Sequence, residues 1–267
     1  MKHNRIKSCL ATAILLGCTS CSVKEDRSVC PCFLTVDLST VLDAESTSPS
    51  LWNKGLDLLL ISGGNPFVHD RISYEEALYK YEYLVPRTDN GVIGILGADN
   101  GVIDGDRMLL PEGSQSDALY VSSEMVPCQG ETAFSSLKMF KQFSKVEITG
   151  LQSFDFVKEV SAGSSGLDLM TRSALPGRFR YILECDEDGV CTFLLPRQAD
   201  DGVIILLYGK DGKLDNSIPL GQYLSASGFD WNAENLADVS VNVDRTMAFI
   251  NITIGGWTHT VDFTYTL

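Results

Sequence analysis

Basic residues are scarce in this sequence. Lys and Arg together number 21 against 35 Asp and Glu in 267 residues, a formal net charge of −14. A surface of this sign repels phosphate backbones and anionic lipid headgroups. The composition therefore argues against nucleic-acid binding, and any attachment to a membrane has to come from something other than basic side chains.

Residue patterns that build catalytic or metal sites are also missing. Beyond the first residues the chain has two histidines, His69 and His259, and neither stands in a spacing that forms a zinc site or a hydrolytic triad. The AGSSG run at 162–166 lacks the second glycine of a nucleophile elbow, so we expect a loop there. The sequence predicts a protein that is not an enzyme, with no cofactor, no metal and no small-molecule substrate.

Long apolar runs are absent as well, but one short run stands near the N-terminus. Lys2, Arg5 and Lys7 precede an apolar stretch from Cys9 to Gly17, which is too short to span a bilayer as a stop-transfer helix. A basic start followed by a short apolar region is typical of a secretory signal. We therefore expect the protein to be exported.

Two cysteines follow this stretch at the depth of a lipoprotein cleavage site. Cys18 ends LLGC and Cys21 ends CTSC, and in both a small residue directly precedes the cysteine. Cys18 fits the lipobox better, and Cys21 is the alternative. The signal peptide is then 1–17, or 1–20, and a polar linker continues to residue 32.

The other cysteines would reach an oxidising compartment, where disulfides form. Only Cys185 and Cys191 have a local argument for pairing. They flank DEDGV, and a hairpin turned at Asp188-Gly189 would set them nearly opposite each other. Pairing stays open for the rest, which are Cys30, Cys32, Cys128 and whichever of Cys18 and Cys21 is not lipidated.

Alternating apolar and polar residues predict strands along most of the chain. In FLTVDLS, Leu34, Val36 and Leu38 form one face, and LDLLLISG places Leu56, Leu58 and Leu60 on one face. The run ISYEEALYKYEYLVPR favours strand through its alternating tyrosines. Helical signals are confined to residues 220–224 and to a short second helix before residue 237. Further strands are expected at 117–123, 144–150, 178–185, 190–195, 203–208, 239–244, 247–254 and 260–267.

An internal repeat divides the chain. VPRTDNGVIGIL at 85–96 matches LPRQADDGVIILL at 195–207, each with Pro-Arg, a polar turn and a Val-Ile strand. We interpret the two segments as matching hairpins of a duplicated domain. This predicts an all-β chain of two tandem β-sandwiches, 33–140 and 141–267.

The order of several segments resembles the fimbrillin-associated anchor proteins of Bacteroidetes fimbriae, the FimB-type family. They are SVKEDRSVCPC after the lipoprotein cysteine, a central KMFKQFSKVEITGL, the LPR turn, IPLGQYLSASGFDW, and LADVSVNVDRTMAFINITIGGW. The resemblance covers nearly the whole mature chain. It implies transthyretin-like sandwiches in an outer-membrane lipoprotein, acylated with fatty acids such as palmitate, that fixes a fimbrial shaft subunit to the cell surface and limits fimbrial growth.

Lys24, Glu25 and Asp26 resemble the Lys-plus-acidic tag that sends lipoproteins of this phylum to the outer face of the membrane. The position of the tag suits Cys21 as the lipidated residue, whereas the lipobox suits Cys18. Both assignments stay open.

The C-terminal residues are a candidate interface for strand pairing. Val261, Phe263, Tyr265 and Leu267 alternate with polar residues, and fimbriae of this kind assemble by β-strand addition. Whether the chain donates or accepts a strand stays open. A surface glycan-binding lipoprotein is the alternative function, with Trp52, Trp231, Trp257 and the tyrosines at 74–83 as stacking candidates.

Overall fold

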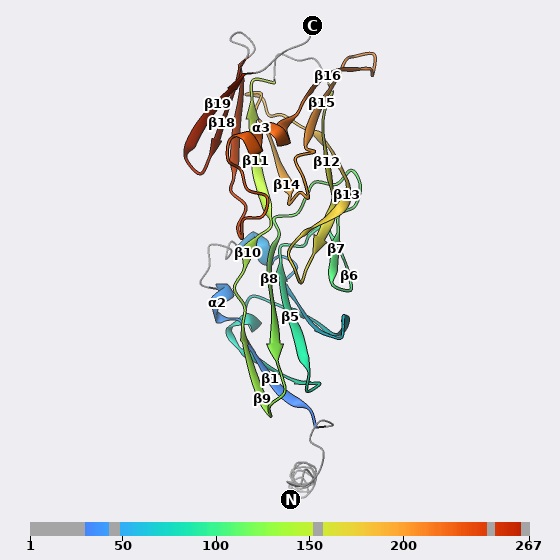
Figure 1. The fold of residues 1–267 in the computed structure, drawn as a ribbon, viewed down its shortest axis with the longest axis vertical. Helices are drawn as coiled ribbons and strands as arrows, with labels where there is room; N and C mark the ends of the chain where they lie inside the picture. The colour runs from blue at the N-terminus through green and yellow to red at the C-terminus, as the bar shows by residue number, and fades with distance from the viewer. Residues whose placement is uncertain (1–29, 43–48, 152–156, 245–248, 263–267) are drawn as a thin grey trace, which may run out of the picture.

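The computed structural model describes residues 30–42, 49–151, 157–244 and 249–262. Most of these residues lie in strands arranged in several sheets, so the predicted all-β class is confirmed. The molecule is elongated, with strands of the N-terminal half in the lower part of Figure 1 and strands of the C-terminal half in the upper part.

The N-terminal half is a sandwich of two sheets around an apolar core. Strand β1 (Cys32–Asp37) runs between β4 (Lys80–Val85), which is antiparallel to it, and β9 (Thr132–Ser136), which is parallel. Alternate residues of β1, including Leu34 and Val36, are fully buried and pack against Leu56, Leu58 and Leu60 of the facing sheet. That sheet has the order β10 (Phe140–Lys141), β8 (Tyr120–Pro127), β5 (Asp89–Leu96), β2 (Leu56–Ser62), β3 (Asn65–Ile72).

The C-terminal half is built in the same way. Strand β11 (Phe143–Thr149) runs between an antiparallel β14 (Cys191–Pro196) and a parallel β17 (Val239–Asp244), and β18 (Phe249–Ile254) and β19 (Trp257–Asp262) extend that sheet. The facing sheet contains β16 (Leu214–Ile218), β15 (Ile204–Tyr208), β12 (Val157–Asp168) and β13 (Ala174–Leu183). One apolar cluster, which includes the fully buried Phe193, fills the space between the two sheets.

The repeat in the sequence corresponds to a repeat in topology. Strands β1, β4 and β9 pair as β11, β14 and β17 do, and the order β8-β5-β2-β3 recurs as β16-β15-β12-β13. The prediction of two hairpins is wrong, however. From β4 to β5, and from β14 to β15, the chain leaves one sheet and enters the facing one. A proline ends the first strand each time, and in the first copy Asn90 Nδ2 donates to the carbonyl oxygens of Pro86 and Thr88, both at 2.9 Å, which stabilises the crossing.

A short hairpin joins the two halves. Strands β6 (Val102–Asp104) and β7 (Arg107–Leu109) belong to the N-terminal half by sequence, yet Met108 of β7 pairs with Leu167 of β12. A Cβ atom at Gly166 would collide with the carbonyl oxygen of Met108, so glycine permits this close approach. The expected loop at 162–166 is therefore wrong, because these residues lie inside β12.

The hairpin also covers a second apolar layer. Leu59, Ile61, Ile93 and Ile95 face away from the first core and pack with Met108 and Leu167. Strand β2 is consequently buried on both faces, whereas its sequence pattern predicts one apolar face. A strand that is covered on both faces has a nearly continuous apolar sequence, and LDLLLIS is such a sequence.

Helical segments are short and connect strands. They are α2 (Ser39–Leu42), η3 (Pro49–Trp52), η4 (Glu76–Leu78) and α3 (Leu220–Ala226). The expected second helix before residue 237 is absent from the described chain, because Asp230 Oδ1 accepts the N–H of Asn232 in a turn and the N–H of Leu236 donates to Lys141. The run ISYEEALYK contains η4, before which the Ser73 hydroxyl donates to Glu76 Oε2 at 2.8 Å, and the next strand starts only at Lys80.

A buried arginine lies beside the junction between the halves. Arg197, which follows Pro196 in the repeat, donates to Gln142 Oε1 at 3.0 Å and to the carbonyl oxygens of Trp231 and Ala233. Burial and the nearby Arg172 lower the pKa of the Arg197 guanidinium. Arg197 therefore fixes the start of β11 against the 230–234 turn.

The domain boundary at 140/141 stays a prediction that limited proteolysis tests. We expect cleavage in the 130–142 region to give two folded fragments, because each half has its own core. Since β7 pairs with β12, the fragments should co-elute in native buffer and separate only in denaturant. An uncleavable chain, or fragments that unfold on cleavage, would contradict two independent domains.

Candidate attachment and docking sites

The predicted attachment site belongs to the N-terminal segment. Cys18, Cys21 and the tag residues Lys24, Glu25 and Asp26 lie outside the described residues. The described chain starts at Cys30 and enters β1 at Cys32, at the lower end of the molecule in Figure 1. A tether on the N-terminal segment would therefore act on this end of the protein.

Strand β1, the first element after this segment, is held at its far end by Asp37. Oδ1 of Asp37 accepts the backbone N–H of Ser39 at 3.0 Å, and Oδ2 contacts Lys80 Nζ at 3.0 Å. The Ser39 backbone and side chain, followed by Lys80, lower the pKa of Asp37 to about 2. The carboxylate thus caps α2 and pairs β1 with β4 at ordinary pH.

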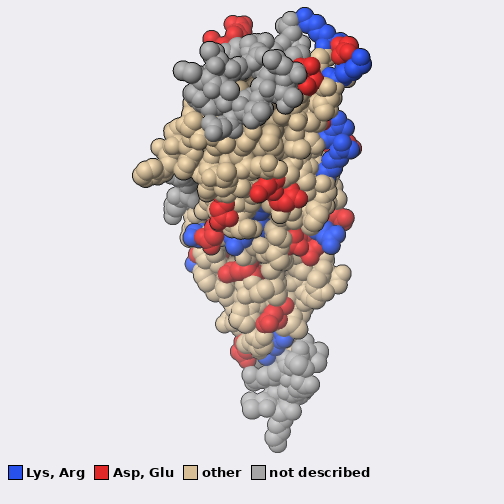
Figure 2. Space-filling view, turned by 45° about the horizontal axis from the view of Figure 1, so that its top comes forward, with Lys and Arg blue, Asp and Glu red and all other residues tan. Residues whose placement is uncertain are grey.

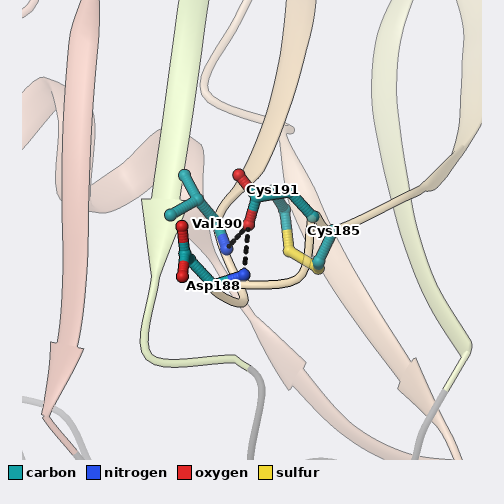
Figure 3. Close-up of a disulfide and its surroundings, with 5 residues drawn as sticks. Cys185, Asp188, Val190 and Cys191 are labelled. Atoms are coloured by element: carbon teal, nitrogen blue, oxygen red, sulfur yellow. Dashed lines mark hydrogen bonds between the residues drawn. A yellow bond between two sulfur atoms is a disulfide. The ribbon is translucent and has the colours of Figure 1, made fainter.

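The structure joins Cys185, two residues after the end of β13, to Cys191, the first residue of β14 (Figure 3). Their Cα atoms are 4.0 Å apart, and the two residues form an isolated antiparallel bridge. Asp186 Oδ1 accepts the N–H groups of Asp188 at 3.0 Å and Val190 at 2.8 Å, so side-chain hydrogen bonds shape the connecting turn. Gly189, with φ of 77°, supplies the left-handed residue.

This bridge is expected to contribute to stability. Replacing both cysteines, as Cys185→Ala with Cys191→Ala, should lower the free energy of unfolding by about 2 kcal/mol, because the cross-link closes only a short loop. Guanidinium denaturation measures the change. Wild-type protein treated with reductant should lose at least as much, because reductant opens this bridge together with any other disulfide of the protein. Equal stability of all three samples would show that the bridge does not form or contributes nothing.

The β18–β19 hairpin carries the described part of the C-terminal candidate interface. Gly255 and Gly256 have φ of 55° and 84°, which fits a two-residue type I′ turn. Val261 pairs with Ile250, whereas Phe263, Tyr265 and Leu267 lie outside the described residues. Strand β19 stands at the end of its sheet, with no further strand beyond it in the described chain.

The register shows which backbone groups this edge presents. In a two-residue hairpin the flanking pair, Ile254 and Trp257, exchanges hydrogen bonds, and bonded pairs then alternate along the ladder. The N–H groups of Thr258 and Thr260 therefore point away from β18. The Thr260 hydroxyl donates to Asn251 Oδ1 at 2.7 Å, which ties the side chain to β18 while the backbone group stays at the open edge. Such an edge is a template for another strand.

Two of the three candidate stacking tryptophans are core residues. Trp52 is 7% exposed and packs edge-on against Tyr74, and Trp231 is 6% exposed and packs against Phe229. Trp257, beside the hairpin turn, is 78% exposed. The described tryptophans therefore form no exposed cluster.

His69 has a structural partner. Its Nε2 lies 2.8 Å from Oδ1 of Asp57, a buried carboxylate that also receives Arg71 Nη2 at 2.8 Å. This group ties β3 to β2. Among the described residues no cluster of three or more His, Cys, Asp or Glu is arranged to hold a metal ion.

Charge is dispersed on the face shown in Figure 2. Acidic side chains are separated by broad uncharged areas, and basic ones gather mainly along one side. No helix in the described part of the chain is long and apolar enough to cross a membrane. This face offers no continuous basic track for a nucleic acid.

No protein-family model matches the chain, and no curated protein is significantly similar in sequence. Solved structures do share its fold. A Bacteroides thetaiotaomicron protein described as polysaccharide-binding has 14% identity and a TM-score of 0.61, over 86% of this chain and 98% of its own. The fimbrial anchor protein Mfa2 of Porphyromonas gingivalis has 11% identity and a TM-score of 0.58, over 86% and 99%. A B. thetaiotaomicron protein described as an adhesin has 13% identity and a TM-score of 0.54, over 87% and 99%.

Proposed function

We propose that the protein is a non-enzymatic lipoprotein that holds a fimbrial shaft subunit at the outer membrane and limits fimbrial growth. The observation that supports this most is the fold shared with the fimbrial anchor protein Mfa2 over nearly the whole length of that protein. The signal peptide with its lipobox cysteines, Cys18 and Cys21, supports attachment to the membrane by acyl chains.

The arrangement of the two candidate sites fits a bridging role. The chain enters β1 at one end of the long axis, and the β18–β19 hairpin lies in the half at the other end (Figure 1). A tether at the first end leaves the second free to meet a shaft subunit. Because the tether keeps the protein at the membrane, a shaft that pairs with it cannot grow past it. This is how binding would limit length.

Strand pairing is the mode of contact that this protein offers. The open edge of β19 presents the N–H groups of Thr258 and Thr260, and an extended segment of a shaft subunit can bond to them. The residues that follow, 263–267, would continue the same interface in the proposal.

An affinity pull-down tests the proposal. Tagged full-length protein, recovered from surface-solubilised cells, should bring with it the fimbrial shaft subunit as its main partner. A tagged unrelated outer-membrane lipoprotein from the same strain is the control and should recover none. Recovery of the protein without any fimbrial subunit would contradict the proposal.

Glycan binding is the second candidate, favoured by exposed Trp257 and by the fold shared with a protein described as polysaccharide-binding. A single exposed indole can stack on a sugar ring. Affinity electrophoresis in polysaccharide gels should then retard the wild type but not Trp257→Ala. Equal mobility in every gel would exclude this candidate.

A further inference from the structure

Two free cysteines lie in the core of the N-terminal sandwich. Cys32 and Cys128 are both fully buried and belong to one apolar cluster. Burial, followed by the influence of nearby Cys128, raises the pKa of the Cys32 thiol. Buried cysteines are common in cores, but these two share one cluster although 95 residues lie between them in the sequence.

The backbone holds both cysteines in place. Cys32 is the first residue of β1, where it is paired with Val85, and the N–H of the next residue, Phe33, donates to Glu131 at 2.9 Å. Cys128 directly follows β8, and its N–H donates to Thr88 at 3.2 Å. Both side chains therefore lie in the core between the facing sheets, and backbone hydrogen bonds hold the main chain next to each cysteine.

We propose that Cys32 and Cys128 form a disulfide in the exported protein, linking β1 to the end of β8. Exported chains fold in an oxidising compartment, where cysteines that meet in the native fold become bridged. This step rests on the export that the proposed function requires.

The oxidant would be another disulfide, supplied by a thiol oxidoreductase or a small disulfide compound. The thiolate of one cysteine attacks that disulfide, giving a mixed disulfide and one released thiol. The second cysteine, as thiolate, then attacks the mixed disulfide, forms the Cys32–Cys128 bond and releases the other thiol. Two protein thiols are oxidised, one donor disulfide is reduced to two thiols, and the protons pass to these. Because both cysteines are fully buried in the fold, the exchange occurs while the chain folds.

The bridge would matter for a tethered protein. Strand β1 is the first element after the lipid tether, so a pull on the fimbria reaches the sandwich at Cys32. Without the bridge, the load peels β1 from β4 and β9. With the bridge, the pulling force passes from Cys32, the first residue of β1, directly to the end of β8 in the facing sheet. The residues between the two cysteines then carry no force and cannot extend.

Disulfide mapping on the wild-type full-length protein tests the proposal. Protein from the envelope fraction is unfolded in N-ethylmaleimide without reductant, digested and sequenced by tandem mass spectrometry. We expect no alkylation at Cys32 or Cys128 and a cross-linked peptide pair two hydrogen atoms lighter than the separate thiols. Fragment ions should place the bond at Cys32 rather than Cys30. The Cys185–Cys191 pair serves as the internal reference.

Alkylation of both cysteines without prior reduction, or a bond from Cys128 to another cysteine, would overturn the proposal. Mapping does not depend on the fimbria. The two proposals can fail separately. If the bridge is mapped in wild-type cells but a strain that lacks this protein still keeps its fimbriae attached, the disulfide is supported and the proposed function is wrong.

Single-molecule pulling from both ends gives a second readout. The oxidised chain should unfold to a contour shorter by the 95 enclosed residues, about 340 Å at roughly 3.6 Å per residue, and regain that length in reductant. Equal contour lengths with and without reductant would also overturn the proposal.

Discussion

Removing both candidate acylation sites is expected to release the protein from the membrane. In the variant with Cys18→Ala and Cys21→Ala, incorporation of labelled fatty acid should fall to background. Each buried methylene of an acyl chain contributes about 0.8 kcal/mol to membrane binding, so losing all chains removes most of the affinity. The acidic composition offers no electrostatic substitute.

The single variants identify the acylated residue. Only one of Cys18→Ala and Cys21→Ala should abolish labelling. Cys185→Ala, which changes a cysteine far from the signal peptide, is the control and should label as wild type does. If neither the single nor the double change alters lipid incorporation and membrane retention, the attachment half of the proposal is wrong.

A proline at the open edge of β19 is expected to release the shaft while the protein stays folded and membrane-bound. In Thr260→Pro the N–H that points away from β18 is lost, and the ring obstructs an incoming strand. Loss of that bond and of its neighbours should weaken binding roughly ten-fold or more. Shaft subunit in the culture medium, quantified by immunoblot, measures the effect. Phe263→Pro lies in the segment outside the described residues, and it tests whether the candidate interface continues beyond β19: we expect it to release shaft subunit into the medium as well.

The matched control is Thr260→Val, which removes the hydroxyl bonded to Asn251 but retains the backbone N–H. It should hold fimbriae as wild type does. Full-length fimbriae on cells that carry folded Thr260→Pro would place the interface elsewhere on the molecule.

Local patterns predicted part of this fold, whereas strands β3, β9, β12 and β16 were not predicted. Period-two alternation is a property of a strand's own residues, so the strand beginning at Cys32 and those near the C-terminus could be found from the sequence. The repeat around Pro86 and Pro196 likewise pointed to duplication, and the recurring strand order agrees with it. Its geometry could not be predicted, because a turn sequence does not say which sheet receives the next strand.

The pairing of β7 with β12 was missed for the same reason. Leu167 and Met108 are far apart in the sequence, and the residues around each of them do not predict that the two pair. One signal was available. In LDLLLIS, apolar residues occupy positions on both faces of the strand, which indicates that both faces are buried.

Some of the candidate sites could likewise be predicted from the sequence, and others could not. A lipobox is a short linear pattern, so Cys18 and Cys21 could be proposed from the sequence. The shared burial of Cys32 and Cys128 in one core depends on where β1 and β8 lie in the folded sandwich. Only the structure brings these two cysteines together.

The central claim is that this protein keeps fimbriae on the cell, and the most direct test is the share of shaft subunit that stays cell-bound when the gene is deleted and restored. We predict that deletion moves most of the shaft into the medium as longer fimbriae, and that the restored wild-type gene returns short fimbriae to the surface. Cell-bound fimbriae of unchanged number and length in the deletion strain would contradict the account.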